Sequence, residues 1–145
     1  MKTIKVGIVG CGFISDAYLK AAVQFPVIKI IACADINPNA AEEKEKKYGI
    51  KATDVQSLMA DPEVDVVLNL TTPQHHVAIG LEAIANGKHV YSEKPLALSV
   101  KEASELVRAA SSKGLRVGCA PDTFFGGAHQ TARKAIDSGI IGDAV

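Results

Sequence analysis

Two kinds of segment alternate along the chain. Short β-branched runs typical of buried strands are followed by stretches whose apolar residues recur every three to four positions, as they do on helices. The expected strands are residues 4–9, 28–34, 50–52, 64–70, 88–91 and 115–120. The expected helices are residues 13–25, 38–48, 54–59, 76–86, 100–113 and 128–138. Such an alternation predicts a parallel sheet with helices packed on both faces.

The predicted fold class is α/β, a Rossmann-type doubly wound and mostly parallel sheet with the strand order 3-2-1-4-5-6. Right-handed crossover connections fix this winding. With 145 residues the chain suits one domain, so we expect residues 1–145 to form a single unit. In its first helix, Ile14, Tyr18, Ala21 and Phe25 share one side and are the expected buried face, and Pro26 is expected to end the helix.

The first strand runs directly into a glycine turn, Gly10-x-Gly12-x-x-Ser15. Gly10 permits a tight turn, and Gly12 lets backbone approach a pyrophosphate closely. The helix that begins near Phe13 directs unpaired N–H groups and its positive dipole end at the same anion. Ser15 stands where a third glycine or alanine is usual, and it is small enough to keep helix and strand close. The pattern predicts a dinucleotide site.

An acidic residue ends the second strand. Asp35 follows Gly12 at close to the spacing of about 20 residues expected for the acid that binds a ribose 2′-hydroxyl. Its charge would repel the extra phosphate of NADP, and Ile36 and Asn37 offer no guanidinium to bind that phosphate. NAD is therefore the expected cofactor. The alternative is a surface aspartate that only ends a strand.

Two later loops also leave carboxyl ends of strands, where open α/β sheets hold their ligands. Thr71-Thr72-Pro73 offers hydroxyls and a stiff turn, and His76 lies on the first turn of the next helix; an exposed helix start without ligand contact is the alternative. In Glu93-Lys94-Pro95, the proline restricts Lys94 to extended backbone that would project its side chain. Lys94 could then relay a proton from a substrate hydroxyl, unless it is a surface lysine neutralised by Glu93.

Composition excludes several other functions. The 16 basic residues balance the 16 acidic residues, so no net charge draws the chain to nucleic acid or lipid. We see neither a membrane span nor a secretory signal, and we expect a cytoplasmic protein. Cys11, Cys33 and Cys119 form no metal or redox motif and are expected to be reduced thiols, although the nearby helix N-terminus could lower the pKa of Cys11. No metal site is expected.

The motifs together resemble the N-terminal half of the Gfo/Idh/MocA oxidoreductases. The resemblance covers essentially the whole chain and rests on Gly10-x-Gly12-Phe13-Ile14, Asp35, Thr72-Pro73 with His76, Gly87-Lys88-His89-Val90 and Glu93-Lys94-Pro95-Leu96-Ala97. It implies NAD or NADP bound by this domain, and hydride transfer at a sugar or polyol carbon with Lys94 assisting at the hydroxyl. The predicted cofactor-binding residues are Gly10, Gly12, Phe13, Ile14, Asp35, Thr71, Thr72, Pro73, His76, Glu93, Lys94 and Asp122.

Members of that family carry a second α/β domain that completes the active site and usually makes the oligomer contact. The resemblance therefore implies that this chain is an N-terminal fragment of a homo-oligomeric enzyme, which binds NAD but does not turn over a small-molecule substrate. A non-catalytic NAD-sensing or interaction module is the competing interpretation. A methyltransferase that uses S-adenosylmethionine shares the glycine turn and the acid, but it gives no reason for Glu93-Lys94-Pro95.

Overall fold

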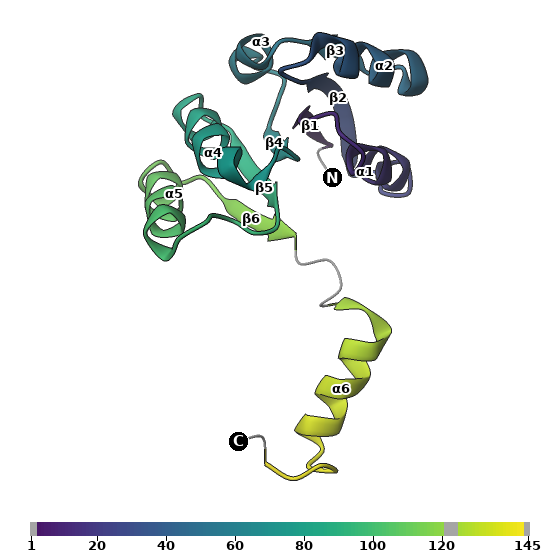
Figure 1. The fold of residues 1–145 in the computed structure, drawn as a ribbon, viewed down its shortest axis with the longest axis vertical. Coiled ribbons are helices and arrows are strands. Elements are labelled where there is room, and N and C mark those ends of the chain that lie inside the picture. The colour runs from purple at the N-terminus through teal and green to yellow at the C-terminus, as the bar shows by residue number, and fades with distance from the viewer. Residues whose placement is uncertain (1–2, 121–124, 144–145) are drawn as a thin grey trace.

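The computed structural model describes residues 3–120 and 125–143. Within these ranges one parallel sheet contains β1 (Ile4–Val9), β2 (Ile28–Ala34), β3 (Lys51–Thr53), β4 (Val66–Asn69), β5 (His89–Glu93) and β6 (Val117–Ala120). The strand order is β3-β2-β1-β4-β5-β6, which confirms the predicted Rossmann-type topology (Figure 1).

The described residues form six α-helices, of which the first five cover the sheet on both faces. They are α1 (Ser15–Ala22), α2 (Pro38–Tyr48), α3 (Val55–Ala60), α4 (His76–Ala85), α5 (Val100–Ser112) and α6 (Gly127–Asp137), with a 3₁₀ turn, η1 (Pro73–His75), before α4. No helix within the described ranges is long and apolar enough to cross a membrane.

Alternating strand side chains build two separate cores. On β1, Val9 packs with the residues of α3, α4 and α5, whereas Ile8 packs with those of α1 and α2. On β4, Val67 and Leu68 divide between the two faces in the same way. Because successive side chains of a strand point to opposite faces, a continuous apolar run is what a sheet covered on both sides requires.

The expected helix boundaries follow the capping chemistry of the sequence. The Asn37 side chain accepts a hydrogen bond from the backbone of Asn39 at 3.2 Å, and Ser99 accepts one from Glu102 at 3.2 Å. Gly49 ends α2 in the left-handed conformation, with φ 68°. These contacts satisfy N–H and C=O groups that a helix end leaves unpaired, which is why the ends could be placed from sequence.

The predicted buried face of the first helix is wrong. The structure ends α1 at Ala22 and buries Ser15 and Leu19, while Ile14 is 38% and Phe25 53% exposed. The buried side of α1 includes the polar residue Ser15. The adjoining side of the helix is therefore the more apolar one in the sequence, and it was predicted to be buried. That adjoining side, which includes Tyr18, instead borders an open apolar groove of about 410 Å³ over β1, β2, β4 and β5.

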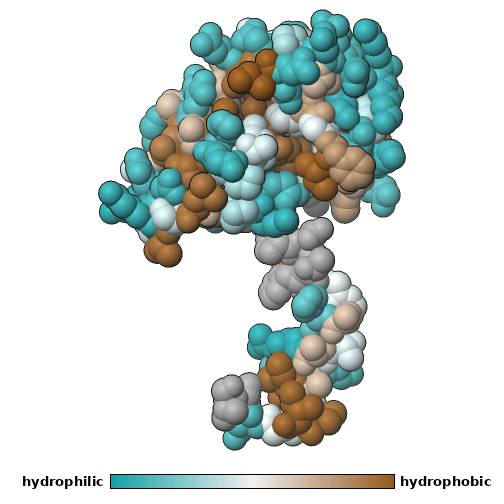
Figure 2. Space-filling view, in the orientation of Figure 1, coloured by the Kyte–Doolittle hydropathy of each residue, from teal (hydrophilic) through white to brown (hydrophobic). Residues whose placement is uncertain are grey.

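The last helix extends away from the sheet. In Figure 1, α6 lies below the sheet and does not cover either of its faces. Figure 2 shows hydrophobic residues gathered on this segment, and Ile136, Ile140 and Ile141 are 43%, 80% and 64% exposed. The fold that positions the carboxyl ends of the strands is therefore complete without α6.

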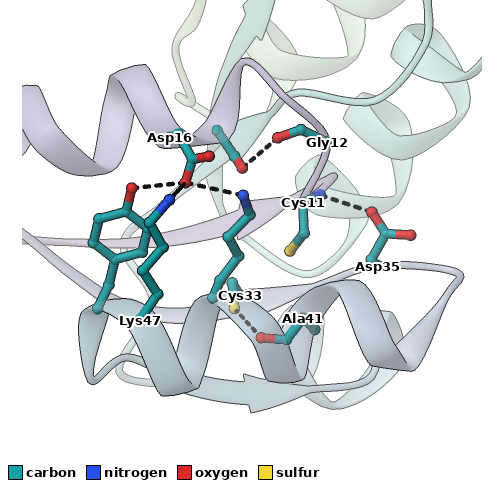
Figure 3. Close-up of polar contacts among 10 residues, drawn as sticks. Cys11, Gly12, Asp16, Cys33, Asp35, Ala41 and Lys47 are labelled. Carbon is teal, nitrogen blue, oxygen red and sulfur yellow. Dashed lines mark hydrogen bonds and ion pairs between the residues drawn. The ribbon is translucent and has the colours of Figure 1, made fainter.

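One carboxylate joins α1 to α2. Asp16 accepts hydrogen bonds from the Tyr48 hydroxyl at 2.7 Å, from Lys44 at 3.0 Å and from Lys47 at 3.3 Å (Figure 3). The Tyr48 hydroxyl and these two lysines hold the pKa of Asp16 well below its usual range. The network thus favours the ionised carboxylate and anchors the first helix on the second.

Asp16→Asn is expected to lower the melting temperature at pH 7. Because the folded-state pKa of Asp16 lies below its unfolded value of about 4, its contribution is present above pH ~4 and is lost as the pH falls further. Thermal unfolding followed by circular dichroism at pH 7 and pH 3 should therefore show a smaller difference between variant and wild type at the lower pH. Asp137→Asn, which removes the exposed partner of Arg133 on α6, is the matched control. An equal difference at both pH values would contradict the account.

Candidate functional site

The glycine turn and both later loops leave the same edge of the sheet. At the carboxyl end of β1, Val9 pairs with Ala34 of β2 and with Asn69 of β4, and Asn69 in turn pairs with Ser92 of β5. The residues that follow these positions, Gly10, Asp35, Leu70 and Glu93, therefore lie in line along one edge. The convergence expected from the parallel sheet is observed.

Gly10 is enclosed by the loop that follows β4. Its φ is 101°, and a Cβ there would lie 2.6 Å from the carbonyl carbon of Leu70 and 2.8 Å from the nitrogen of Thr71. Gly12 differs, because a Cβ on it would meet no atom within 4 Å. Gly10 is thus required by the protein's own packing, whereas packing does not explain Gly12. Open space beside Gly12 fits a turn that receives a ligand.

Ser15 performs the role predicted for a small third residue. It is fully buried, and its hydroxyl donates a hydrogen bond to the carbonyl of Gly12 at 2.6 Å. The turn before α1 is thereby fixed at both ends, at Gly10 by packing and at Gly12 by this bond. Phe13 and Ile14 follow at the helix start, where the positive end of the helix dipole favours an anion.

Asp35 contacts the glycine turn directly. Its Oδ2 accepts a hydrogen bond from the backbone N–H of Cys11 at 2.7 Å (Figure 3). Its Oδ1 accepts one from the N–H of Asn37 at 2.8 Å. An ionised carboxylate oxygen has a second lone pair, so each oxygen can accept one more bond. Asp35 is half-buried and remains able to receive two neighbouring hydroxyls.

The helix N-terminus does not lower the pKa of Cys11, as the sequence suggested that it could. The thiol is turned into the protein, 4% of the residue is exposed, and Sγ lies 3.5 Å from the carbonyl oxygen of Ala34. A hydrogen bond with Cys33, together with burial, raises the pKa of Cys11. The side chain does not meet the helix N–H groups that were expected to stabilise a thiolate. Cys11 therefore serves the site through its backbone N–H.

The β4 loop is held by an asparagine that sequence reasoning missed. Asn69 is fully buried, its Oδ1 accepts a hydrogen bond from the Thr71 hydroxyl at 2.7 Å, and its Nδ2 donates to the His76 carbonyl at 3.0 Å. The Thr72 hydroxyl meets Nδ1 of His75 at 2.9 Å, and Pro73 begins η1. An amide side chain at the end of an otherwise apolar strand was the available signal.

The predicted end of the fifth strand is two residues short. β5 continues through Ser92 and Glu93 because β6 pairs with both, and polar residues give no sequence signal for such an extension. Glu93 accepts a hydrogen bond from the Tyr18 hydroxyl at 2.7 Å and one from the backbone N–H of Lys94 at 3.0 Å. Lys94 is exposed at the strand end. Among the ion pairs found in the described ranges, none involves Lys94.

His76 is a buried residue of the predicted site, as Gly10 is. Its side chain is fully buried, and its two ring nitrogens face the carbonyl oxygens of Pro95 and Thr71. Asp122 lies outside the described residues. Within residues 3–120 and 125–143, no cluster of three or more histidine, cysteine or acidic residues could hold a metal ion.

Comparisons with known proteins agree with this geometry. The sequence profile described as "Oxidoreductase family, NAD-binding Rossmann fold" (GFO_IDH_MocA) matches residues 4–120. The chain is 33% identical over 138 residues to 1,5-anhydro-D-fructose reductase of Ensifer adhaerens, and 32% identical over 147 residues to inositol 2-dehydrogenase of Burkholderia cenocepacia. These matches cover 94% and 97% of the chain, and 41% and 43% of the two relatives.

A solved structure shares the fold. The WlbA dehydrogenase of Bordetella pertussis, in complex with NADH and UDP-GlcNAcA, is 27% identical with a TM-score of 0.90. That match covers 96% of the chain and 42% of the solved one. The chain thus spans about two fifths of the length of the proteins that it resembles.

Proposed function

Because the chain belongs to the Gfo/Idh/MocA oxidoreductase family, we propose that it is the NAD-binding part of a dehydrogenase for a sugar or polyol. The family and its NAD(P)-binding Rossmann domain follow from the profile match over residues 4–120. The class of substrate rests on relatives such as inositol 2-dehydrogenase. The class of substrate is a proposal because the chain spans only 43% of that relative.

The contact between Asp35 and the glycine turn carries the proposal. A dinucleotide needs N–H groups for its diphosphate and, a few ångströms away, an acceptor for its adenosine ribose. The hydrogen bond from the Cys11 N–H to Asp35 holds those two parts together at 2.7 Å. The open space beside Gly12 supports the same placement, with the diphosphate over the start of α1 and the ribose hydroxyls on the carboxylate.

The same carboxylate supports NAD over NADP. A 2′-phosphate would be brought against Asp35, and like charges at short range repel. The next residues supply no compensating cation, because Ile36 is 98% exposed and apolar and Asn37 caps α2 with its side chain. We therefore assign NAD as the preferred cofactor of this chain.

Lys94 is the proposed catalytic residue. NAD⁺, when bound, supplies the hydride acceptor. The alcohol that loses a hydride must also lose its hydroxyl proton, and an amine at the rim of the site can receive it. Lys94 is exposed at the end of β5, and the Glu93 carboxylate is hydrogen-bonded to Tyr18 and to backbone. Because Glu93 has these other partners, the contacts support a role in which the Lys94 amine faces the substrate.

The remaining predicted residues have lesser roles in this proposal. Thr71, Thr72 and Pro73 shape the loop beside the middle of the cofactor, and Glu93 orients the strand end from which Lys94 projects. In the proposal this chain alone binds NAD weakly, and it does not turn over a substrate because groups outside residues 1–145 complete catalysis. Measurable oxidation of a polyol such as myo-inositol by this chain would refute that part.

Calorimetric titration with NADH and NADPH tests the cofactor assignment. We expect NADH to bind more tightly than NADPH, on the order of tenfold or more, because only NADPH places a phosphate against Asp35. S-adenosylmethionine serves as the competing ligand. Tighter binding of NADPH would overturn the preference for NAD. Binding of S-adenosylmethionine alone by the folded chain would overturn the dinucleotide assignment.

A further inference from the structure

His76 links two loops of the candidate site from inside the protein. Its Nδ1 lies 2.6 Å from the carbonyl oxygen of Pro95, and its Nε2 lies 2.9 Å from the carbonyl oxygen of Thr71. The residue is 0% exposed. One buried ring therefore joins the segment that follows β5 to the segment that follows β4.

Both ring nitrogens are committed to these contacts. A carbonyl oxygen only accepts hydrogen bonds, so each contact needs an N–H on the ring. A neutral imidazole has one N–H and a protonated ring has two, and in either form both nitrogens face main-chain acceptors. No ring nitrogen remains for a cofactor. The predicted role of His76 as a cofactor ligand thus gives way to a different one.

The histidine is itself fixed to the sheet. Asn69, at the end of β4, donates to the His76 carbonyl at 3.0 Å and accepts the Thr71 hydroxyl at 2.7 Å. Asn69 and His76 are both fully buried, so water cannot replace these partners easily. The His76 ring is consequently held in a fixed position between the two loops, unlike a mobile side chain on the surface.

The geometry points to His76 as the positioning residue for Lys94. Pro95, whose carbonyl meets the ring, is the residue directly after the lysine. On the other face of the sheet, Tyr18 of α1 holds Glu93, the residue directly before it, at 2.7 Å. Lys94 therefore lies between two anchored neighbours, which restrict where its amine can reach. This inference rests on the proposed catalytic role of Lys94.

The test compares His76→Leu, His76→Gln and the wild-type chain. His89→Gln is the matched control, because Nδ1 of His89 also bonds backbone, accepting from the N–H of Arg116 at 3.0 Å, but at the amino end of β5. Residue-resolved amide hydrogen exchange measures the protection of Lys94 without any ligand. In a second arm, ¹³C-methylated lysines report by NMR how NADH changes the environment of the Lys94 amine, whose signal is assigned with Lys94→Arg.

We expect His76→Leu to speed exchange of the Lys94 amide by on the order of tenfold, since the loop loses its anchor. The NADH-induced shift of the Lys94 signal should shrink in the same variant although NADH still binds. His76→Gln, which keeps N–H donors and is the milder change if the leucine variant does not fold, should recover part of both effects. His89→Gln should leave both unchanged.

Unchanged Lys94 protection in both His76 variants would overturn the inference. If NADH affinity nevertheless falls by about a hundredfold in those variants, His76 is a cofactor ligand. A wild-type chain that binds no NADH would defeat the proposed function, and the exchange arm would still decide whether His76 anchors the loop.

Discussion

Alanine at position 10 is expected to destabilise the domain severely. Gly10 has φ 101°, and the added Cβ would lie 2.6 Å from backbone of Leu70, which cannot move as a side-chain end could. The unfavourable backbone conformation costs about 1–3 kcal/mol and the overpacking about as much again. Against a typical total stability of ~5–15 kcal/mol, the loss is large. Urea unfolding of Gly10→Ala and wild type would measure it.

Gly12→Ala is the matched control for this prediction. Its Cβ would meet no protein atom within 4 Å, so the free energy of unfolding should change by less than about 1 kcal/mol. NADH affinity should nevertheless fall, because the methyl group occupies the space that the proposal assigns to the diphosphate. Equal destabilisation by both substitutions would contradict the packing account. Unchanged NADH affinity in Gly12→Ala would contradict the placement of the diphosphate.

The sheet was predictable because strand and helix patterns are local, and its order followed from the crossover connections of a doubly wound fold. Apolar residues stand next to each other in β1 and β4 since helices cover both faces, and side chains such as Asn37 and Ser99 mark where helices begin. The buried face of α1 was not predictable in the same way. Ser15 occupies a position where packing against the strand requires a small residue, and a hydrophobicity pattern reads that position as exposed.

The candidate site also has parts that could be predicted from the sequence and parts that could not. The placement of the glycine turn and Asp35 at one edge of the sheet could be predicted, because it follows from backbone geometry at fixed spacing. The contacts that hold the Lys94 segment could not. Tyr18 reaches Glu93 from α1, and His76 reaches Pro95 from another helix. Only the folded chain brings such partners together, so the sequence could single out His76 but not its contact with Pro95.

Removal of the Asp35 carboxylate should change which cofactor the chain prefers. Asp35→Ala is expected to weaken NADH binding by about 1–3 kcal/mol, through the loss of hydrogen bonds from ribose hydroxyls to a charged acceptor. Binding of NADPH should weaken less or improve, because the same substitution removes the repulsion of the 2′-phosphate. Isothermal titration of wild type and variant with both nucleotides gives the ratio of the two affinities.

The ratio of the NADH and NADPH affinities shows whether Asp35 contacts the ribose, because Asp35 also supports the glycine turn. Loss of its hydrogen bond from Cys11 would loosen the glycine turn and weaken both nucleotides alike, leaving their ratio unchanged. Asp54→Ala is the control, since Asp54 likewise accepts a backbone N–H, that of Ser57 at 2.8 Å, but caps α3. It should lower stability without altering the ratio. If Asp35→Ala leaves the ratio at its wild-type value, the carboxylate supports the turn and does not contact the ribose.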